Sequence, residues 1–215
     1  MMRRNNKGST LTSMLLVALL YMIPGLVRAD DKMNTKAAAQ TYEKAIFAGG
    51  CFWCMEPPFE KLDGVKSVVS GFAGGKEFNP EYKAVASGKT GHVEAVEITF
   101  DPNKVSYKKL LDVFWRNVNP MDADGQFVDR GFQYSTAIFT FDKDQQQQAE
   151  SSKKALAATK KFPKAIVTPI KPYTTFYKAE EYHQDYYKKN PLRYKYYRYN
   201  SGRDKFLEKY WSDKE

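Results

Sequence analysis

Alternating apolar and polar residues predict the strands of this chain. The clearest alternation covers 92–100 and ends at an Asp-Pro pair. One of its faces carries Glu94, Val96, Ile98 and Phe100. Four further apolar or β-branched runs, bounded by glycines or turn residues, have the length of strands: 43–48, 65–72, 134–141 and 164–170.

Helical patterns lie between these runs. Ser106 is a suitable N-cap for a helix to about Asn117, because apolar residues recur on one side of that segment. A polar helix is predicted over 142–161, since acids begin it and lysines end it, as the helix dipole favours. Shorter helical segments are predicted at 51–62, 82–86 and 179–189. Strands and helices alternate without a steady βαβ rhythm, which indicates a single α+β domain with a mixed or antiparallel sheet flanked by helices.

The N-terminus has the layout of a secretory signal peptide. Residues 1–29 comprise a basic start, a short apolar run and a small-residue cleavage pattern. The predicted organisation is a signal peptide (1–29), a flexible lead-in (30–42), a catalytic domain (43–195) and an irregular tail rich in tyrosine and lysine (196–215). We therefore expect export, to the periplasm or outside the cell. The alternative is a membrane anchor formed by 11–27.

The net charge of the chain does not point to a particular class of partner. The formal net charge is +9, and removal of 1–29 lowers it to +5 because that segment holds four basic residues and no acid. The remaining positive charge is spread along the chain without a long basic stripe, so nucleic acid is not an expected partner.

The only two cysteines are Cys51 and Cys54, three residues apart after Gly49-Gly50. A strand that ends in two glycines and leads into a helix places Cys51 at the helix N-terminus, where a thiolate is stabilised. Cys54 lies one turn further in, so we expect it to be more shielded and less activated. These features predict that Cys51 attacks a substrate and that Cys54 resolves the product.

The segment Gly50-Cys51-Phe52-Trp53-Cys54 resembles the active-site signature of the peptide methionine sulfoxide reductase A family, GCFWG or GCFWC. Three further segments resemble motifs of that family in the same order: Tyr82 with 88–94, 129–134, and 181–186. The similarity covers about 44–194. It implies a ferredoxin-like α+β core and reduction of the S-epimer of methionine sulfoxide, free or in proteins.

The resemblance also implies roles for individual residues. Cys51 is the nucleophile, Glu94 is a buried and protonated acid, and Tyr82 and Tyr134 donate hydrogen bonds to the sulfoxide oxygen. The residues expected to bind the substrate or shape its pocket are Phe52, Trp53, Asp129 and His183, the last through a structural hydrogen bond. Two alternatives stay open: Glu94 in an outward salt bridge, and the two aromatics in plain core packing.

One departure from the family concerns the resolving cysteine. Many members carry it after a C-terminal Asn-Pro pair, but here Lys195 stands near that place. We therefore expect Cys54 to condense with a Cys51 sulfenic acid. A thioredoxin-like protein is the expected reductant, with no cofactor and a monomeric enzyme.

Three other functions fit part of the sequence. Zinc could bind four residues, Cys51, Cys54, His92 and His183, although their spacing matches no common zinc finger. A general exported thiol-disulfide oxidoreductase accounts for the cysteines but not for Glu94 or the tyrosine motifs. A tyrosine-rich binding module leaves the setting of Cys51 unexplained, and wrapping around the domain is the expected role of the tail.

Overall fold

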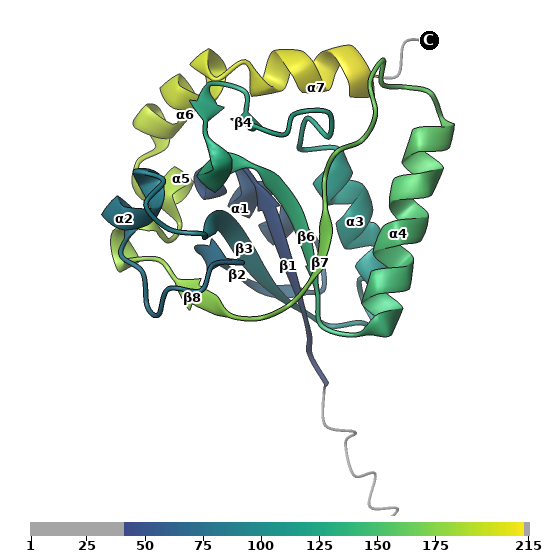
Figure 1. Ribbon diagram of the computed structural model, residues 1–215, viewed down its shortest axis with the longest axis horizontal. Helices are drawn as coiled ribbons and strands as arrows, with labels where there is room; N and C mark the ends of the chain where they lie inside the picture. The colour runs from purple at the N-terminus through teal and green to yellow at the C-terminus, as the bar shows by residue number, and fades with distance from the viewer. Residues whose placement is uncertain (1–40, 213–215) are drawn as a thin grey trace, which may run out of the picture. The chain divides into compact units, whose positions relative to one another are not determined.

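A six-stranded sheet is the centre of the fold in the computed structural model, which describes residues 41–212 (Figure 1). Its strands are β1 (Glu43–Gly49), β2 (Val65–Ala73), β3 (Val93–Phe100), β6 (Thr136–Thr140), β7 (Ile170–Pro172) and β8 (Phe176–Lys178). They lie in the order β7-β6-β1-β3-β2-β8, and every neighbouring pair is antiparallel except β6 with β7. The predicted α+β class with a mixed sheet is confirmed.

Seven α-helices and a small hairpin complete the described part of the chain. The helices are α1 (Phe52–Glu60), α2 (Tyr82–Ala86), α3 (Tyr107–Trp115), α4 (Lys143–Ala158), α5 (Tyr186–Lys189), α6 (Pro191–Asn200) and α7 (Arg203–Trp211). The hairpin joins β4 (Gly125–Gln126) to β5 (Asp129–Arg130), and 3₁₀ turns cover Phe132–Tyr134 and Glu181–His183. Ser106 caps α3 as predicted, because its side chain accepts a hydrogen bond from the backbone N–H of Lys109 at 3.2 Å.

The main core lies between the sheet and the helices α1, α3 and α4. Phe47 of β1 is central to it, with ring centroids 5.4 Å from Phe59 and 5.1 Å from Phe114. All three rings are fully buried, and each such burial contributes about 1.5–3 kcal/mol. The opposite face of the sheet holds a smaller cluster against which Tyr173 and Phe176 pack. Glu94, Val96, Ile98 and Phe100 alternate along β3 as predicted, with the last three in the main core.

The predicted strand over 164–170 is wrong. The chain there has no regular strand pairing until Ile170, and only the Pro169 carbonyl just before it accepts a backbone hydrogen bond from Ile138 of β6, at 3.0 Å. Separate hydrogen bonds hold this segment instead, such as the one from Val167 N to the Pro120 carbonyl at 2.8 Å. The predicted helix over 179–189 is also divided, into a 3₁₀ turn and α5, because Asp185 between them has a left-handed backbone conformation (φ 55°).

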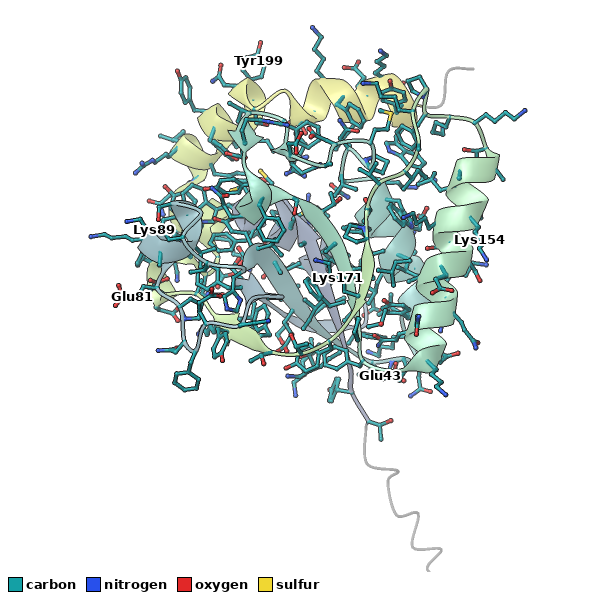
Figure 2. All side chains as sticks on the ribbon, in the orientation of Figure 1. Glu43, Glu81, Lys89, Lys154, Lys171 and Tyr199 are labelled. Carbon is teal, nitrogen blue, oxygen red and sulfur yellow. The ribbon has the colours of Figure 1, made fainter. Side chains whose placement is uncertain are left out.

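The C-terminal segment is helical, so the predicted irregular tail is wrong. Pro191 begins α6, where its fixed φ suits the first turn, and Gly202 with φ 81° separates α6 from α7. The rings of Phe206 and Tyr210 in α7 lie 6.3 and 5.0 Å from that of Phe162, so the tail packs on the domain. Figure 2 shows Tyr199 pointing outward from α6, and its side chain is 84% exposed.

The predicted signal peptide and residues 30–40 of the predicted lead-in lie outside the described residues. Among residues 41–212, no helix has the length and apolar character needed to cross a membrane.

Candidate active site

Two glycines place Cys51 at the start of α1. Gly50 has φ 78°, and a Cβ added there would lie 2.5 Å from Cβ of Gln126. Gly49 is equally confined, because an added Cβ would lie 2.5 Å from Sδ of Met55. The glycines therefore permit a tight turn in a crowded place, and Cys51 is the N-cap residue of α1, as predicted.

Glu94 approaches the first turn of α1 from β3. Its Oε2 accepts a hydrogen bond of 3.0 Å from the backbone N–H of Phe52, and its side chain is almost fully buried. Burial raises the pKa of Glu94 to about 8, so the carboxyl is mostly protonated at neutral pH. The alternative of an outward salt bridge is wrong.

Aromatic rings surround the helix start. Phe52 is 1% exposed, and its ring centroid lies 6.1 Å from Phe72 and 6.3 Å from Tyr82. Trp53 is less buried and stacks on Tyr186 with centroids 3.6 Å apart. Phe52 thus also packs in the core, and Trp53 is the more exposed of the two rings.

His183 orients Trp53. Nε1 of Trp53 donates a hydrogen bond of 3.2 Å to Nδ1 of His183, as expected for a structural histidine. Burial lowers the pKa of His183 to about 4, so the ring is neutral at pH 7 and Nε2 carries its proton.

Tyr82 at the start of α2 and Tyr134 in the 3₁₀ turn before β6 join in one cluster. A hydrogen bond links their side chains, and both are electrostatically coupled to Glu94 and Cys51. Burial raises the pKa of Tyr82 to about 12 and that of Tyr134 further, so both hydroxyls keep their protons and can donate. Tyr134 lies in a 3₁₀ turn before β6, whereas the sequence placed it in a strand.

Asp129 has a partner that the sequence analysis missed. The Tyr197 hydroxyl donates a hydrogen bond to Oδ2 of Asp129, and the Tyr197 ring meets Trp53 edge-on at 6.1 Å. Burial raises the pKa of Asp129, although the Tyr197 hydrogen bond lowers it. Tyr197 was assigned to an irregular tail, but the helical spacing of Tyr194, Tyr197 and Arg198 after Pro191 could have indicated one face of a helix.

The two thiols are free and buried, and their expected acidities are reversed. Burial raises the pKa of Cys51, and its hydrogen bond to Cys54 raises it further. The same hydrogen bond lowers the pKa of Cys54 to about 6, with help from the charges of Arg203 and Arg198. The prediction that Cys54 is more shielded is confirmed, with 0% exposure against 7% for Cys51. The prediction that it is less activated does not hold in this geometry, because the hydrogen bond with Cys51 lowers the pKa of Cys54 and the charges of Arg203 and Arg198 add to this effect.

The potential zinc ligands are not gathered. His92 uses both ring nitrogens in the loop before β3: Nδ1 accepts from Gly75 N at 3.2 Å, and Nε2 donates to the Glu77 carbonyl at 2.9 Å. Among residues 41–212, no group of three or more histidine, cysteine, aspartate or glutamate side chains has the geometry of a metal site.

A buried thiol beside a protonated carboxyl and two phenol donors suits the transfer of an oxygen atom from a substrate to sulfur. The fold and the site thus define a thiol-dependent oxidoreductase. Residues 43–215 match the family described as "Peptide methionine sulfoxide reductase", and the chain belongs to the A type of this family. Such enzymes draw electrons from thiols and use no prosthetic cofactor.

Relatives from bacteria support this assignment. The chain is 51% identical over 173 residues to "Peptide methionine sulfoxide reductase MsrA 2" of Staphylococcus aureus (strain MRSA252), covering 80% of this chain and 98% of the relative. It is 54% identical over 169 residues to "Peptide methionine sulfoxide reductase MsrA" of Halalkalibacterium halodurans, covering 79% and 96%.

Solved structures share the fold. Reduced Mxr1 from Saccharomyces cerevisiae is similar with a TM-score of 0.67 and 29% identity, covering 72% of this chain and 88% of Mxr1. Methionine sulfoxide reductase A of Corynebacterium diphtheriae gives a TM-score of 0.64 and 32% identity, covering 73% and 78%.

Proposed function

We propose that this protein reduces the S-epimer of methionine sulfoxide, free or in proteins, and repairs oxidised exported proteins as a monomer. The observation that carries the proposal is the link from Phe52 N to Glu94 Oε2 at 3.0 Å, which fixes a protonated acid beside the thiol at the start of α1. Export rests on the sequence of residues 1–29.

In the first step, Cys51 attacks the sulfoxide sulfur. Glu94 gives a proton to the sulfoxide oxygen while Tyr82 and Tyr134 donate hydrogen bonds to it. The oxygen is transferred to Cys51, and Glu94 regains the proton that the thiol loses. The products are methionine and a Cys51 sulfenic acid. Trp53 and Phe52 form the wall that receives the S-methyl group.

In the second step, Cys54 condenses with the sulfenic acid to give a Cys51–Cys54 disulfide and water. The side chains of residues three apart at the start of a helix can meet, and the two thiols already share a hydrogen bond. A thioredoxin-like protein then reduces the disulfide by thiol-disulfide exchange.

The test is turnover of separate S and R methionine sulfoxides by wild type, Cys51→Ser and Cys54→Ser. We expect wild type to reduce the S-epimer only, Cys51→Ser to be inactive, and Cys54→Ser to complete one turnover without recycling on thioredoxin. Reduction of insulin disulfides without reduction of either sulfoxide would instead favour a general thiol-disulfide oxidoreductase.

A further inference from the structure

Arg203, the first residue of α7, is buried beside the active-site turn. It is 1% exposed, its Nη2 donates to the Gly49 carbonyl at 2.9 Å, and its Nη1 donates to the Asn117 carbonyl. Nη1 also lies 3.7 Å from Sδ of Met55. Gly50 leaves room for this approach, since a Cβ there would lie 3.1 Å from Nη2.

Among residues 41–212, no carboxylate forms an ion pair with this guanidinium, although its charge lowers the pKa of Asp129. Within residues 41–212, no aspartate or glutamate oxygen lies within 4.0 Å of Arg203, and its Nε has no hydrogen-bond partner. A buried cation is costly without a counter-charge, and backbone carbonyls supply only partial charge. An anion close to Arg203 would therefore be stabilised.

Arg198 reaches the same place from α6. Its Nη1 donates to the Cys54 carbonyl at 3.3 Å, and its Nε and Nη2 lie 2.8 and 2.6 Å from Oδ1 of Asp204. Arg198 shares a helix face with Tyr194 and Tyr197, which are both electrostatically coupled to Cys54. The face of α6 directed at the thiols thus carries one cation and two phenols.

We propose that Arg198 and Arg203 hold Cys54 as a thiolate and are positioning residues for its attack on the Cys51 sulfenic acid. This inference rests on the proposed resolving role of Cys54. The Cys54 thiolate places a negative charge near buried Arg203, whose charge acts on both Cys54 and Asp129. Helices α6 and α7 then supply two cations to the thiols from the C-terminal segment of the chain.

The Cys54 thiolate attacks the sulfur of the Cys51 sulfenic acid, the S–O bond breaks and the S–S bond forms. Both electrons of the new bond come from Cys54, so its sulfur is oxidised and that of Cys51 is reduced. The hydroxide that leaves takes a proton from Glu94 and departs as water.

Other groups around Cys54 act alongside the arginines. The thiol of Cys51 forms a hydrogen bond with Cys54 and contributes most to lowering its pKa to about 6, ahead of the two arginines. Burial of Cys54 acts in the opposite direction. The other titratable groups electrostatically coupled to it are Glu94, Tyr194 and Tyr197. These hold protons at neutral pH, so they add little repulsion.

The test measures the pKa of Cys54 in the full chain carrying Cys51→Ser, where Cys54 is the only thiol and the introduced hydroxyl can still donate a hydrogen bond. ¹³Cβ NMR of labelled cysteine follows the titration without a need for access to the buried thiol. We expect Arg198→Gln to raise the pKa by about one unit or more and Arg198→Lys to raise it less. Arg193→Gln, an exposed arginine on the same helix, is the matched control and should leave it unchanged. Arg203→Lys provides a second variant that keeps the buried charge.

The kinetic readout uses the chain with both cysteines. One equivalent of S-sulfoxide should release methionine at the wild-type rate in Arg198→Gln, while disulfide formation at pH 7 slows by about twofold or more and recovers at pH 9. An Arg198→Gln variant with the Cys54 pKa of the Arg193→Gln control would overturn the inference. Absence of the disulfide in wild type, with the pKa shift still present, would overturn only the resolving role of Cys54.

Discussion

The backbone N–H of Phe52 donates a hydrogen bond of 3.0 Å to Oε2 of Glu94 and so joins the first turn of α1 to β3. This bond leaves the second carboxyl oxygen for the proton that burial retains at neutral pH. The backbone N–H next to Cys51 therefore fixes the carboxyl of Glu94 at the start of α1.

Replacement of Glu94 by glutamine tests its role as the acid. The amide oxygen keeps the Phe52 hydrogen bond, but the amide cannot give up a proton, so single-turnover methionine formation should fall by about 100- to 10,000-fold. In wild type the same rate should fall as pH rises through about 8, because the protonated form is the active one. Stopped-flow measurement of both proteins from pH 6 to 10 checks this, and equal rates at pH 7 would contradict it.

The contact between Trp53 and His183 predicts an effect on substrate binding. His183→Leu leaves Nε1 of Trp53 without its acceptor, so the KM for methionine sulfoxide should rise by about tenfold with a smaller change in kcat. His183→Asn offers an acceptor oxygen near the position of Nδ1 and should restore most of the KM. Loss of kcat alone in both variants would argue for direct participation of His183 in the chemistry.

The buried carboxyl of Glu56 should make the free energy of unfolding depend on pH, independently of catalysis. Burial raises its pKa to about 7, while Ser70 Oγ donates a hydrogen bond of 2.9 Å to Oε1. The folded state therefore binds this proton more tightly than the unfolded state. Its contribution is complete below about pH 4.5 and is lost as pH rises to about 7.

Urea unfolding at pH 5 and pH 8 measures this contribution. In Glu56→Gln, the fall in the free energy of unfolding between the two pH values should be smaller than in wild type by about 2–3 kcal/mol. Glu81→Gln is the control, since this carboxyl is exposed on the surface (Figure 2). An unchanged pH dependence in Glu56→Gln would show that Glu56 does not retain its proton.

Two glycines with similar φ angles allow the cost of backbone strain to be measured apart from the cost of crowding around an added Cβ. Gly50 has φ 78° and a crowded Cβ position, whereas Gly202 has φ 81° and no atom within 4 Å of an added Cβ. Gly202→Ala should cost about 1 kcal/mol of unfolding free energy from backbone strain alone. Gly50→Ala should cost about 2–4 kcal/mol, because overpacking adds to the strain, and should lower activity. Equal losses in the two variants would mean that the turn before Cys51 tolerates a side chain.

The sequence predicts the parts of this fold that have strong local patterns. The alternation along β3 gave the inward face of Glu94, and Ser106 gave the start of α3. The strand prediction failed for the segment before β7, because an apolar run with two prolines can also form an extended chain outside the sheet.

The sequence predicted the site residues that belong to family motifs. It missed the residues that only tertiary contacts bring to the site. Tyr197 and Arg203 lie far along the chain from Cys51, and no local pattern links α6 and α7 to the thiols. The acidity of the two thiols depends on burial, on the hydrogen bond between them and on the arginines of those two helices, so the helix N-terminus alone does not predict their order.

The central claim is that Cys51 takes the oxygen of methionine sulfoxide and Cys54 resolves it. Mass spectrometry after mixing reduced protein with one equivalent of S-methionine sulfoxide tests it directly. Wild type should yield one methionine and a Cys51–Cys54 disulfide, and Cys54→Ser should yield one methionine and a dimedone-trapped sulfenic acid on Cys51. A wild-type protein that releases methionine while both thiols stay reduced would contradict the account.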